Sequence, residues 1–531
     1  MYNKSQETID LDIQSVKWNH SGIREFCWQY DSTELISIRD ELLCSLPSLL
    51  RANIALNNQA AISIGVLFKW VICELLKAHE ASALAQLNSG LKNVNVPRRF
   101  RMLYAIKNDV PVESLFIHRA EQPKKDKKLI RLGKKFIREL QWNFSTSLLE
   151  KLKPTKKIAV LQANKLLVSN VRSEKAWLSY SQESDWFIKI PKNVLLADLR
   201  GSDKDFVELM LAEFMSSMTK RNLEIHPQIL AYLNNLLLQT TNFVSFHLCN
   251  LKNSKKIPEE LWTGCAGASI WTQTLAYAVM QTGGHVKGHD HGFGNAHIEQ
   301  LAHHYTNYNC VNEFQTYNSQ NVLIKEREFN KELVIFNKTV KISASKKIQY
   351  SKSVSYTYGT ISSIMYLPTA FHSEGTRLRP ILSDVQYFDW QCRLMNFIKS
   401  LNVSAYYKPH PEGRVKVPES FPQNFGFQNI QGAFESTNQE VDAYIIDFCA
   451  STTTAQILMS NKPVFFLNPG YPKLFEDAKA SLEKRCYILD MWFCDKFRLH
   501  VDWKLFEELI NRKQHKYNND FVASHYAGIQ I

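Results

Sequence analysis

The chain is poor in cysteine motifs. Its 531 residues include ten cysteines, scattered from Cys27 to Cys494, and no two of them form a CxxC pair. Zinc modules need such pairs at a regular spacing, and disulfide-stapled secreted proteins need a dense, even framework of cysteines. The sequence therefore argues against both classes, and we expect reduced thiols, most of them buried.

Long apolar runs are absent as well. The most apolar stretch, Ala60–Leu76, is shorter than the roughly 18 to 20 residues that cross a bilayer, and it carries Lys69 and Glu74. The segment Met1–Glu7 lacks the basic and apolar regions of a signal peptide. The sequence therefore predicts a cytoplasmic protein.

Three short motifs of nucleotide and metal chemistry are also missing. The chain has neither the GxGxxG nor the Walker pattern of phosphate-binding loops, and it has no HExxH zinc motif. The nearest substitute is the small-residue run Thr263–Ser269, which precedes a predicted helix over Ile270–Met280. Small residues permit the close approach of a ligand or of a neighbouring helix, so this run alone does not distinguish the two.

Positive charge, by contrast, is abundant. The formal net charge is +13, although 45% hydrophobic and 22% charged residues are typical of an ordinary globular protein. Basic residues are densest between Lys124 and Arg138, where Leu129, Leu132 and Phe136 recur at helical spacing. This segment is either a solvated face or linker, or an amphipathic helix that makes peripheral contact with the anionic inner membrane.

The length of the chain predicts more than one domain. Residues 1–150 are expected to be mainly helical, because apolar residues recur at intervals of three and four over Thr33–Leu50 and Ala60–Ala78. Asp31 or Ser32 is suited to cap the first helix. The region has no catalytic motif, and we expect it to decorate the fold or to join an acceptor-side domain.

Two series of strands alternating with helices follow. In residues 151–345 we predict strands at Ile158–Leu161, Val194–Ala197 and Phe243–Leu248. In residues 346–531 we predict strands at Ile364–Thr369, Ala405–Lys408, Ala443–Asp447 and Val464–Leu467, and helices at Phe388–Leu401 and Thr454–Met459. Such alternation predicts an α/β fold with two Rossmann-like domains after the helical region. The stretch Lys341–Ser355 is the expected connection between them.

A candidate anion site lies where a strand of the second series gives way to a helix. Asp447 closes the strand, and the hydroxyl residues Ser451–Thr454 open the helix. Hydroxyl groups, free backbone N–H groups and the positive end of a helix together bind anions such as a diphosphate. The same residues also make good helix caps, which is the plainer interpretation. A position beyond the carboxyl end of a parallel strand favours a ligand.

The turn after the preceding strand groups charged side chains. Residues 408–414 read Lys-Pro-His-Pro-Glu-Gly-Arg, and the two prolines stiffen the backbone that presents them. His410 is suited to protonate or hydrogen-bond a leaving phosphate, and Lys408 is suited to neutralise it. We therefore interpret this turn as functional.

The first series contains the best candidate for a catalytic loop, at residues 285–295. The loop follows a predicted strand and is rich in histidine and glycine, which allows close backbone approach. Asp290 or His291 is the right kind of group to deprotonate a hydroxyl. The residues do not decide which of the two is the base.

A metal site is the rival interpretation of this loop, because His297, His303 and His304 follow closely. However, successive side chains of His289–His291 point to alternate sides of a strand or tight loop, and no HExxH spacing or cysteine partner is present. A purely structural loop is the other alternative. We expect no metal.

Together these motifs resemble a known family. The run Tyr366–Thr369, the Lys408–Pro411 turn, Asp447 with Ser451–Thr453, and Lys462–Val464 are similar to the nucleotide-binding domain of GT-B glycosyltransferases of bacterial surface carbohydrate synthesis. That group includes sialyltransferases and Kdo transferases that use CMP-sugars, and the CDP-glycerol polymerases of teichoic acid synthesis. The resemblance covers roughly residues 260–475 and implies two Rossmann-like domains that face a cleft.

The resemblance implies roles for individual residues. In the CMP-sugar enzymes an HP motif and a Ser/Thr pair hold the donor, and an acidic residue in an N-terminal-domain loop acts as the base. His291 departs from the acidic-acidic-glycine pattern of that loop. The implied catalytic residues are Asp290, His291 and His410; the implied donor-binding residues are Lys408, His410, Pro411, Glu412, Gly413, Asp447, Ser451, Thr452 and Thr453; and the implied substrate loop adds His289, Gly292, Gly294 and Asn295.

The resemblance also implies the reaction. The expected donor is a CMP-activated acidic 2-keto sugar, which is a nonulosonic acid of the sialic, pseudaminic or legionaminic type, or Kdo. The expected acceptor is an oligosaccharide or lipid-linked glycan of a capsule or lipopolysaccharide. The CMP-sugar is a substrate, so no cofactor is expected, and basic side chains with a helix dipole supply the counter-charge without a metal.

Two other functions stay open at this point. A polyol-phosphate transferase that uses CDP-glycerol shares most of the C-terminal signature, and differs in forming a phosphodiester. A non-enzymatic protein that binds RNA or an anionic membrane would explain the positive charge. The chain carries no aromatic-interleaved motif of the known RNA-binding modules, so we expect no nucleic acid partner.

Overall fold

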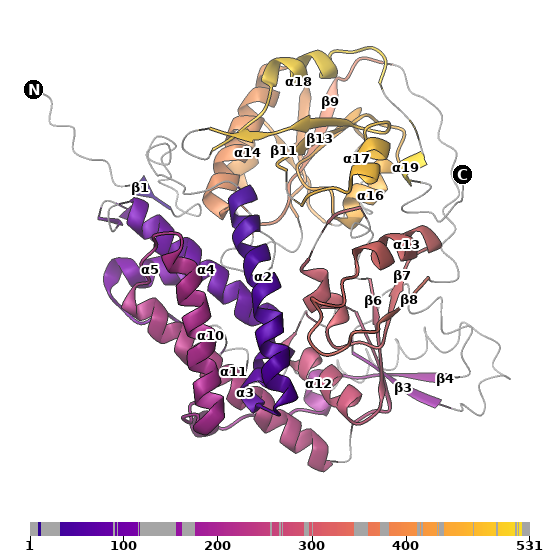
Figure 1. Ribbon diagram of the computed structural model, residues 1–531. Helices are drawn as coiled ribbons and strands as arrows, with labels where there is room; N and C mark the ends of the chain where they lie inside the picture. The colour runs from indigo at the N-terminus through magenta and orange to yellow at the C-terminus, as the bar shows by residue number, and fades with distance from the viewer. Residues whose placement is uncertain are drawn as a thin grey trace, which may run out of the picture.

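The computed structural model describes residues 9–11, 32–88, 91–92, 94–114, 116, 120, 156–161, 176–254, 257–264, 267, 269–290, 297–299, 301–344, 359–371, 382–410, 415, 418–432, 434, 440–470, 472–494, 498–515, 518 and 520–522. These residues form a layer of helices and two six-stranded sheets of parallel strands, with a short parallel pair of β1 (Ile9–Asp10) and β2 (Val94–Asn95) (Figure 1). The basic segment at residues 124–138 lies outside them, as does most of the predicted connection after residue 344.

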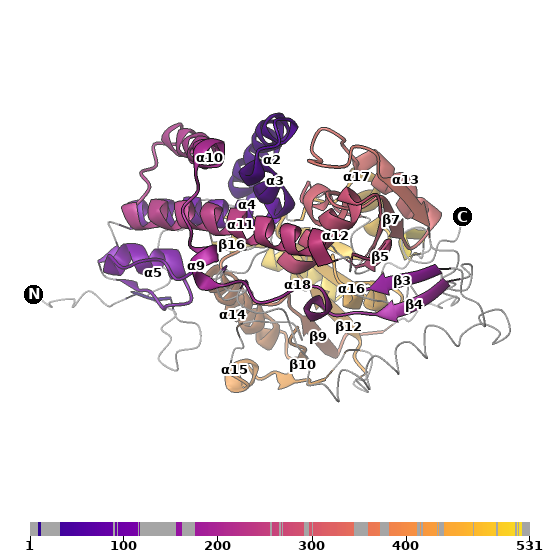
Figure 2. The same ribbon diagram turned by 90° about the horizontal axis from the view of Figure 1, so that it is seen from below.

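The helical layer is built from two stretches of chain. The first supplies α2 (Ser32–Ala55), α3 (Gln59–Val66), α4 (Phe68–Leu87) and α5 (Arg101–Asn108), and the second supplies α9 (Lys192–Leu195), α10 (Gly201–Thr219) and α11 (Pro227–Ser254). Helix α11 packs against α3, α4 and α5, and α10 packs against α2 and α3 (Figure 2). The helical layer therefore contains the helices of residues 192–254 in addition to the helices that the sequence predicts in residues 1–150.

Two strands predicted in the second stretch are wrong. Val194 lies in α9, and Phe243–Leu248 lies inside the 28-residue helix α11. Phe243, His247 and Leu251 are all buried at intervals of four residues. The aromatic and β-branched run is therefore the buried face of a long helix, and a short apolar run does not distinguish this face from a strand.

The helix predicted over Ala60–Ala78 is interrupted at Leu67. Helices α3 and α4 meet there at 82°. Helix α3 is enclosed by α2, α10, α11 and α12, so apolar residues surround its axis and the sequence pattern continues across the bend. Among the described residues, no single helix has the length and apolar character needed to cross a membrane, and α3 with α4 meets those criteria only as this bent pair.

The first sheet has six parallel strands in the order β4-β3-β5-β6-β7-β8. The strands are β3 (Lys156–Val160), β4 (Ala176–Tyr180), β5 (Glu260–Thr263), β6 (His285–His289), β7 (Glu313–Thr316) and β8 (Lys341–Ala344). Helix α12 (Ile270–Gln281) connects β5 to β6, and α13 (Ser319–Glu328) connects β7 to β8. The strand predicted at Ile158–Leu161 is confirmed. Residues 341–344, assigned from the sequence to a connection, instead form the edge strand β8.

The second sheet has six parallel strands in the order β11-β10-β9-β12-β13-β14. They are β9 (Ser363–Leu367), β10 (Ser404–Tyr407), β11 (Gln428–Asn429), β12 (Ala443–Ile446), β13 (Val464–Asn468) and β14 (Tyr487–Asp490). The helices are α14 (Asp384–Ser400), α15 (Ser420–Gln423), α16 (Thr452–Leu458), α17 (Glu476–Leu482), α18 (Trp503–Ile510) and α19 (Asp520–Val522). All four strands predicted here, and both helices, are confirmed.

The strand order of the second sheet reverses between β9 and β12. The chain runs from β9 outward to β10 and β11, then returns to β12 on the other side of β9 and continues to β13 and β14. A reversal of this kind opens a crevice at the carboxyl ends of the two strands, where open α/β sheets bind ligands. The sequence-predicted anion site therefore lies at the topological switch point. A short antiparallel pair, β15 (Trp492–Phe493) and β16 (Leu499–His500), follows β14.

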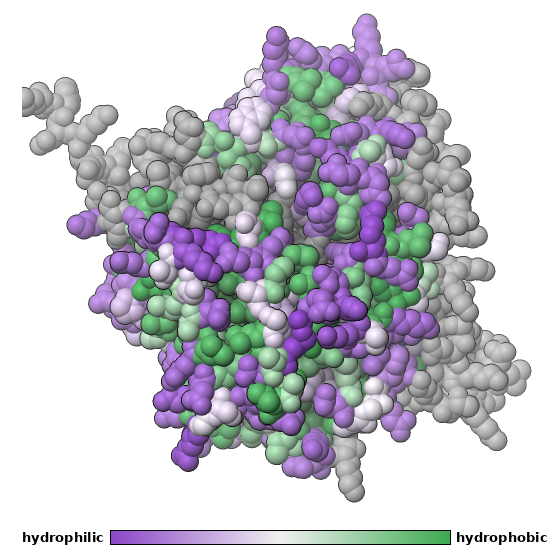
Figure 3. All heavy atoms as spheres, in the orientation of Figure 1, coloured by the Kyte–Doolittle hydropathy of each residue, from purple (hydrophilic) through white to green (hydrophobic). Residues whose placement is uncertain are grey.

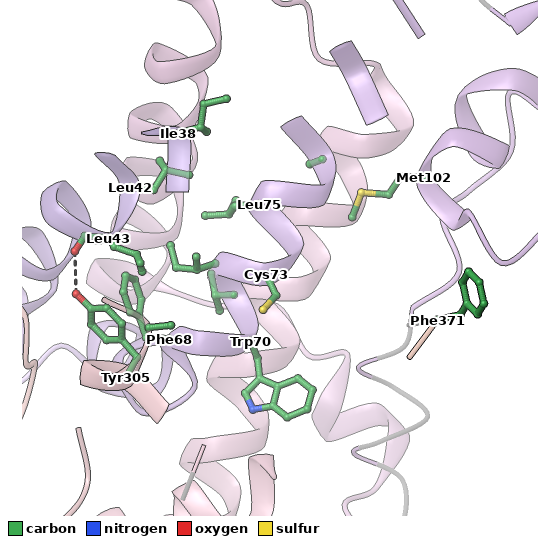
Figure 4. Packing of buried hydrophobic residues seen from close by; sticks show 14 of the residues in the cluster. Ile38, Leu42, Leu43, Phe68, Trp70, Cys73, Leu75, Met102, Tyr305 and Phe371 are labelled. Atoms are coloured by element: carbon green, nitrogen blue, oxygen red, sulfur yellow. Dashed lines mark hydrogen bonds between the residues drawn. The ribbon is translucent and has the colours of Figure 1, made fainter. Parts of the chain in front are cut away.

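Buried apolar side chains join the helical layer to the first sheet. Ile38 and Leu42 of α2 pack with Phe68 and Leu75 of α4, and the hydroxyl of Tyr305 donates a 2.8 Å hydrogen bond to the carbonyl of Leu43 (Figure 4).

On the face seen in Figure 3, hydrophilic and hydrophobic residues are interspersed. Single exposed apolar residues such as Leu56, at 78% exposure, are ordinary on a globular protein and mark no binding surface.

Candidate functional site

The carboxyl ends of β9, β10 and β12 meet at one edge of the second sheet, because the three strands are parallel neighbours. Tyr407 pairs with Tyr366, and Ile446 pairs with Leu367. The residues that follow these strands therefore lie side by side. The structure thus brings Lys408–His410 to the same edge as Asp447–Thr453.

Asp447 is held in a tyrosine clamp. Its carboxylate accepts hydrogen bonds from the hydroxyl groups of Tyr366 and Tyr387, and from the backbone N–H of Thr369 at 3.3 Å. Only 5% of Asp447 is exposed, and burial raises its pKa to about 6 in spite of these donors. We infer that Asp447 orders the loop after β9 and does not contact a phosphate, whose negative charge it would repel.

Lys408 is also held inside the protein. It is 5% exposed, and its ammonium group donates to the carbonyl of Gly432, in the segment after β11. Its backbone N–H extends the ladder by donating to the carbonyl of Tyr366. Lys408 therefore ties the turn after β10 to a neighbouring loop. His410 is half-buried at the same turn, and Pro411, Glu412 and Gly413 lie outside the described residues.

The hydroxyl group of Ser451 caps α16. Its Oγ accepts from the backbone N–H of Thr454 at 3.0 Å, and the hydroxyl of Thr454 donates to the carbonyl of Phe448 at 3.0 Å. Both hydroxyl groups thus stabilise the strand-to-helix junction, as the plainer interpretation expects. Thr453 is only partly buried, and the side chain of Thr452 is not among those described. Because α16 has seven residues, the electrostatic field at its N-terminus comes from the peptide dipoles of only two helical turns.

A buried arginine anchors the other end of α16. Arg485 is fully buried, and its guanidinium donates to the carbonyls of Leu458, Ser460 and Lys462 at distances of 2.7 to 3.1 Å. A cation at a helix C-terminus compensates the negative end of the dipole and satisfies carbonyls that lack helical partners. The position of α16, and with it the Ser451–Thr453 segment, is thereby fixed.

In the first sheet, Asp290 immediately follows β6. Its N–H donates to the carbonyl of Gln315 at 2.9 Å, and its Oδ2 accepts from the hydroxyl of Thr316 at 2.6 Å. Asp290 is 2% exposed. The residues that bury Asp290 would therefore have to move before its carboxylate could take a proton from an acceptor hydroxyl.

The neighbours of Asp290 in the chain are partly described. His289 is the last residue of β6 and is 2% exposed. Its Nδ1 lies 3.0 Å from the carbonyl oxygen of Asp290. The remaining predicted residues of this loop, His291, Gly292, Gly294 and Asn295, lie outside the described residues.

The three histidines that follow the loop have separate partners. His297 Nε2 lies 3.2 Å from the carbonyl of Cys449, and His303 Nδ1 lies 3.0 Å from Glu328. His304 Nε2 accepts from the N–H of Asn330, so its Nδ1 carries the proton that is donated to a carbonyl. Within the described part of the chain, no three potential ligands gather in a group that holds a metal.

The catalytic-loop candidate and the second sheet are joined through residues 297–299. Ile298 forms an antiparallel bridge with Leu474, and hydrogen bonds link Glu299 N–H to the Lys473 carbonyl and Phe475 N–H to the His297 carbonyl. His297 also contacts Cys449, two residues before Ser451. Seven residue steps separate Asp290 from His297, so extended chain spans at most about 25 Å between them.

Several residues around these sites were missed by sequence reasoning. Tyr387 lies in the first turn of α14, and Lys325 and Glu328 lie on α13, and no local motif marks any of them. Thr316 closes β7, a strand that the sequence did not predict. A polar residue at the end of an apolar strand is the one signal that would have identified Thr316. No family model and no curated protein matches this chain.

Proposed function

We propose that the protein is a GT-B glycosyltransferase that moves a CMP-activated acidic 2-keto sugar onto a surface-glycan acceptor. The observation that carries the proposal is the contact between the two α/β regions at residues 297–299. Residues 297–299 connect the segment after β6, where Asp290 lies, to the segment before α16 and to the loop after β13. The two halves of the resemblance are thus adjacent in space, as a transfer between them requires.

In this proposal the nucleotide binds at the switch point of the second sheet. His410 and Thr453 are partly exposed at that edge, and we assign them, with Thr452, to the donor phosphate. Lys408, Asp447 and Ser451 order the loops that carry these residues. The acceptor enters from the side of the first sheet, where Asp290 or His291 takes its proton.

A thermal-shift experiment tests the donor. Because a nucleotide that binds only the native state raises its melting temperature, CMP should stabilise the protein, while UDP and GDP should not. His410→Ala should abolish the shift with CMP. His226→Ala, a partly buried histidine of the helical layer, is the control and should keep it. Stabilisation by UDP or GDP in place of CMP would refute the donor class.

A second experiment tests the base. Asp290→Ala should still be stabilised by CMP but should transfer no sugar, since the donor site is on the other sheet. Turnover equal to that of the unmodified protein would exclude Asp290 from the chemistry and would leave His291 as the candidate. The product separates this reaction from polyol-phosphate transfer, because only the sugar transferase forms a glycosidic bond.

A further inference from the structure

Two arginines, Arg393 and Arg498, share one buried aspartate of α14, and we call them the arginine pair. Nε of Arg393 donates to Oδ2 of Asp389 at 3.0 Å. Arg498 donates to both carboxylate oxygens, from Nε to Oδ2 at 3.1 Å and from Nη2 to Oδ1 at 2.6 Å. Asp389 is 1% exposed, whereas the side chains of Arg393 and Arg498 are 17% and 15% exposed. The arginine pair therefore reaches the surface and the carboxylate does not.

The charges of this group do not balance. Two guanidinium groups face one carboxylate, and no other carboxylate in the described part of the chain pairs with either arginine. Burial lowers the pKa of Arg393, and the charge of Arg498 lowers it further, although Asp389 acts in the opposite direction. Nη1 of Arg393 is shielded from solvent and has no hydrogen-bond partner among the described residues. Because buried charges and N–H donors are normally paired, this excess of positive charge favours an anionic ligand.

An exposed aromatic ring lies on the same side of the chain. Trp492 of β15 pairs with His500 of β16, and their rings are stacked with centroids 6.3 Å apart. The antiparallel ladder continues to Arg498, whose carbonyl accepts from the N–H of Cys494 at 3.0 Å. Arg498 and His500 are two residues apart, so their side chains leave the strand on one side. Trp492 is 50% exposed, and the hairpin thus presents an indole ring next to the arginine pair.

This hairpin begins at the donor edge of the second sheet. Strand β14 is parallel to β13, so it ends at the edge where the other strands end, and only Met491 separates β14 from β15. On α14, Tyr387 donates to Asp447 and lies two residues before Asp389. The arginine pair is therefore on the side of the sheet where the donor is proposed to bind.

We propose that the arginine pair and Trp492 bind an acidic sugar residue of the acceptor glycan. The guanidinium of Arg498 contacts the carboxylate or phosphate of this residue, Arg393 adds its charge, and the sugar ring packs on the indole of Trp492. A guanidinium fork matches the geometry of either oxyanion, and an exposed indole offers an apolar face to a ring. A single excess charge fits one oxyanion and not the phosphate tract of a nucleic acid. The role of this site in transfer rests on the function proposed above.

Calorimetric titration of the full-length protein tests the site. The probes are a linear trimer of N-acetylneuraminic acid, glucose 1-phosphate, uncharged maltotriose and pentathymidylate. At least one of the two acidic sugars should bind, the tighter one identifying the oxyanion, and maltotriose should not bind. Arg498→Met should weaken that binding by about tenfold or more. Trp492→Ala should weaken it by about fivefold. Binding of neither acidic sugar, or tighter binding of pentathymidylate, would refute the proposal.

Two further variants guard against a loss of folding. Arg327→Met is the matched control, because Arg327 also pairs with a single aspartate at the surface, and it should leave the binding of the acidic sugar unchanged. Arg498→Lys keeps the positive charge beside Asp389 but lacks the fork, so it should fold and still bind the sugar less tightly. Trp492 is half exposed, so Trp492→Ala should fold as well. Undiminished affinity in both Arg498→Lys and Trp492→Ala would show that the site is elsewhere.

The binding measurements separate this inference from the proposed function. His410→Ala should lose the thermal shift with CMP and keep the acidic sugar, while Arg498→Met should keep the shift with CMP. If the acidic sugar binds through Arg498 but CMP does not bind, the transferase proposal fails and the sugar site stands. If CMP binds through His410 and no acidic sugar binds, the sugar site fails and the transferase proposal stands.

Discussion

Each sheet ends its fourth strand in a buried aspartate, and the two aspartates have different surroundings. Asp290 follows β6 and its carboxylate accepts a hydrogen bond from the hydroxyl of Thr316, whereas Asp447 follows β12 between two tyrosine hydroxyls. The same residue type at the same position in an α/β layer is thus held by one threonine hydroxyl in one sheet and by two tyrosine hydroxyls in the other.

The surroundings of Asp447 show that hydrogen-bond donors can hold a buried carboxylate in place without offsetting the effect of burial on its pKa. Neutral donors satisfy the oxygens of Asp447 but do not cancel its charge, so burial raises its pKa to about 6. The carboxylate of Asp290 has the hydroxyl of Thr316 as a neutral donor at 2.6 Å. We therefore interpret Asp447 as a fixed anchor of the loop after β9.

The largest expected effect tests the tyrosine clamp. Asp447→Ala leaves two buried hydroxyls without their acceptor, which should lower the free energy of unfolding by about 4 kcal/mol. Urea unfolding at neutral pH measures it. Asp442→Ala is the control, since Asp442 accepts from Ser362 and Ser363 at the opposite, more exposed end of β12. Equal costs for the two variants would contradict the clamp.

The next effect is a pH dependence of stability that arises from Asp447. The folded pKa of about 6 lies above the ordinary 3.8, so proton binding stabilises the folded state below pH 4, and this stability is lost as pH rises through 6. Relative to Asp447→Asn, which cannot titrate, the unmodified protein should lose about 3 kcal/mol between pH 4 and pH 7. Parallel stability curves for the two proteins would show that Asp447 keeps an ordinary pKa.

A smaller effect tests the Asp290 side in the same way. Thr316→Val removes one hydrogen bond to the buried carboxyl group of Asp290 and should cost about 2 kcal/mol in unfolding free energy, while Thr316→Ser should cost less because it keeps the hydroxyl. A cost as large as that of Asp447→Ala would contradict the expectation that one hydroxyl contributes less than the two tyrosine hydroxyls around Asp447.

The smallest effect concerns the contact that ties the two regions together. Arg327 of α13 pairs with Asp477 of α17 at 3.1 Å, and both side chains are more than half exposed. A double-mutant cycle of Arg327→Met and Asp477→Asn should give a coupling of about 0.5 kcal/mol, which high salt removes. A coupling above about 2 kcal/mol, insensitive to salt, would show a buried joint instead.

The second α/β region was predictable because its strands are short, apolar and followed by turn residues. Each predicted strand there is confirmed within one or two residues of its ends. The first region was less predictable, because the apolar run at Phe243–Leu248 fits the buried face of α11 as well as it fits a strand. Its sheet contains strands such as β7 and β8 that carry polar residues, so they lack an apolar signal.

The sequence also predicts some properties of the candidate site and leaves others undetermined. The sequence by itself determined which residues follow the strands, since local patterns encode where a strand stops. Asp290, Lys408, Asp447 and Ser451 were all found in this way. Their roles depend on partners that only the tertiary structure brings together, such as Tyr366, which is 81 residues from Asp447. Hydrogen bonds and charges act over a few ångströms of space, and no spacing in the sequence records that proximity.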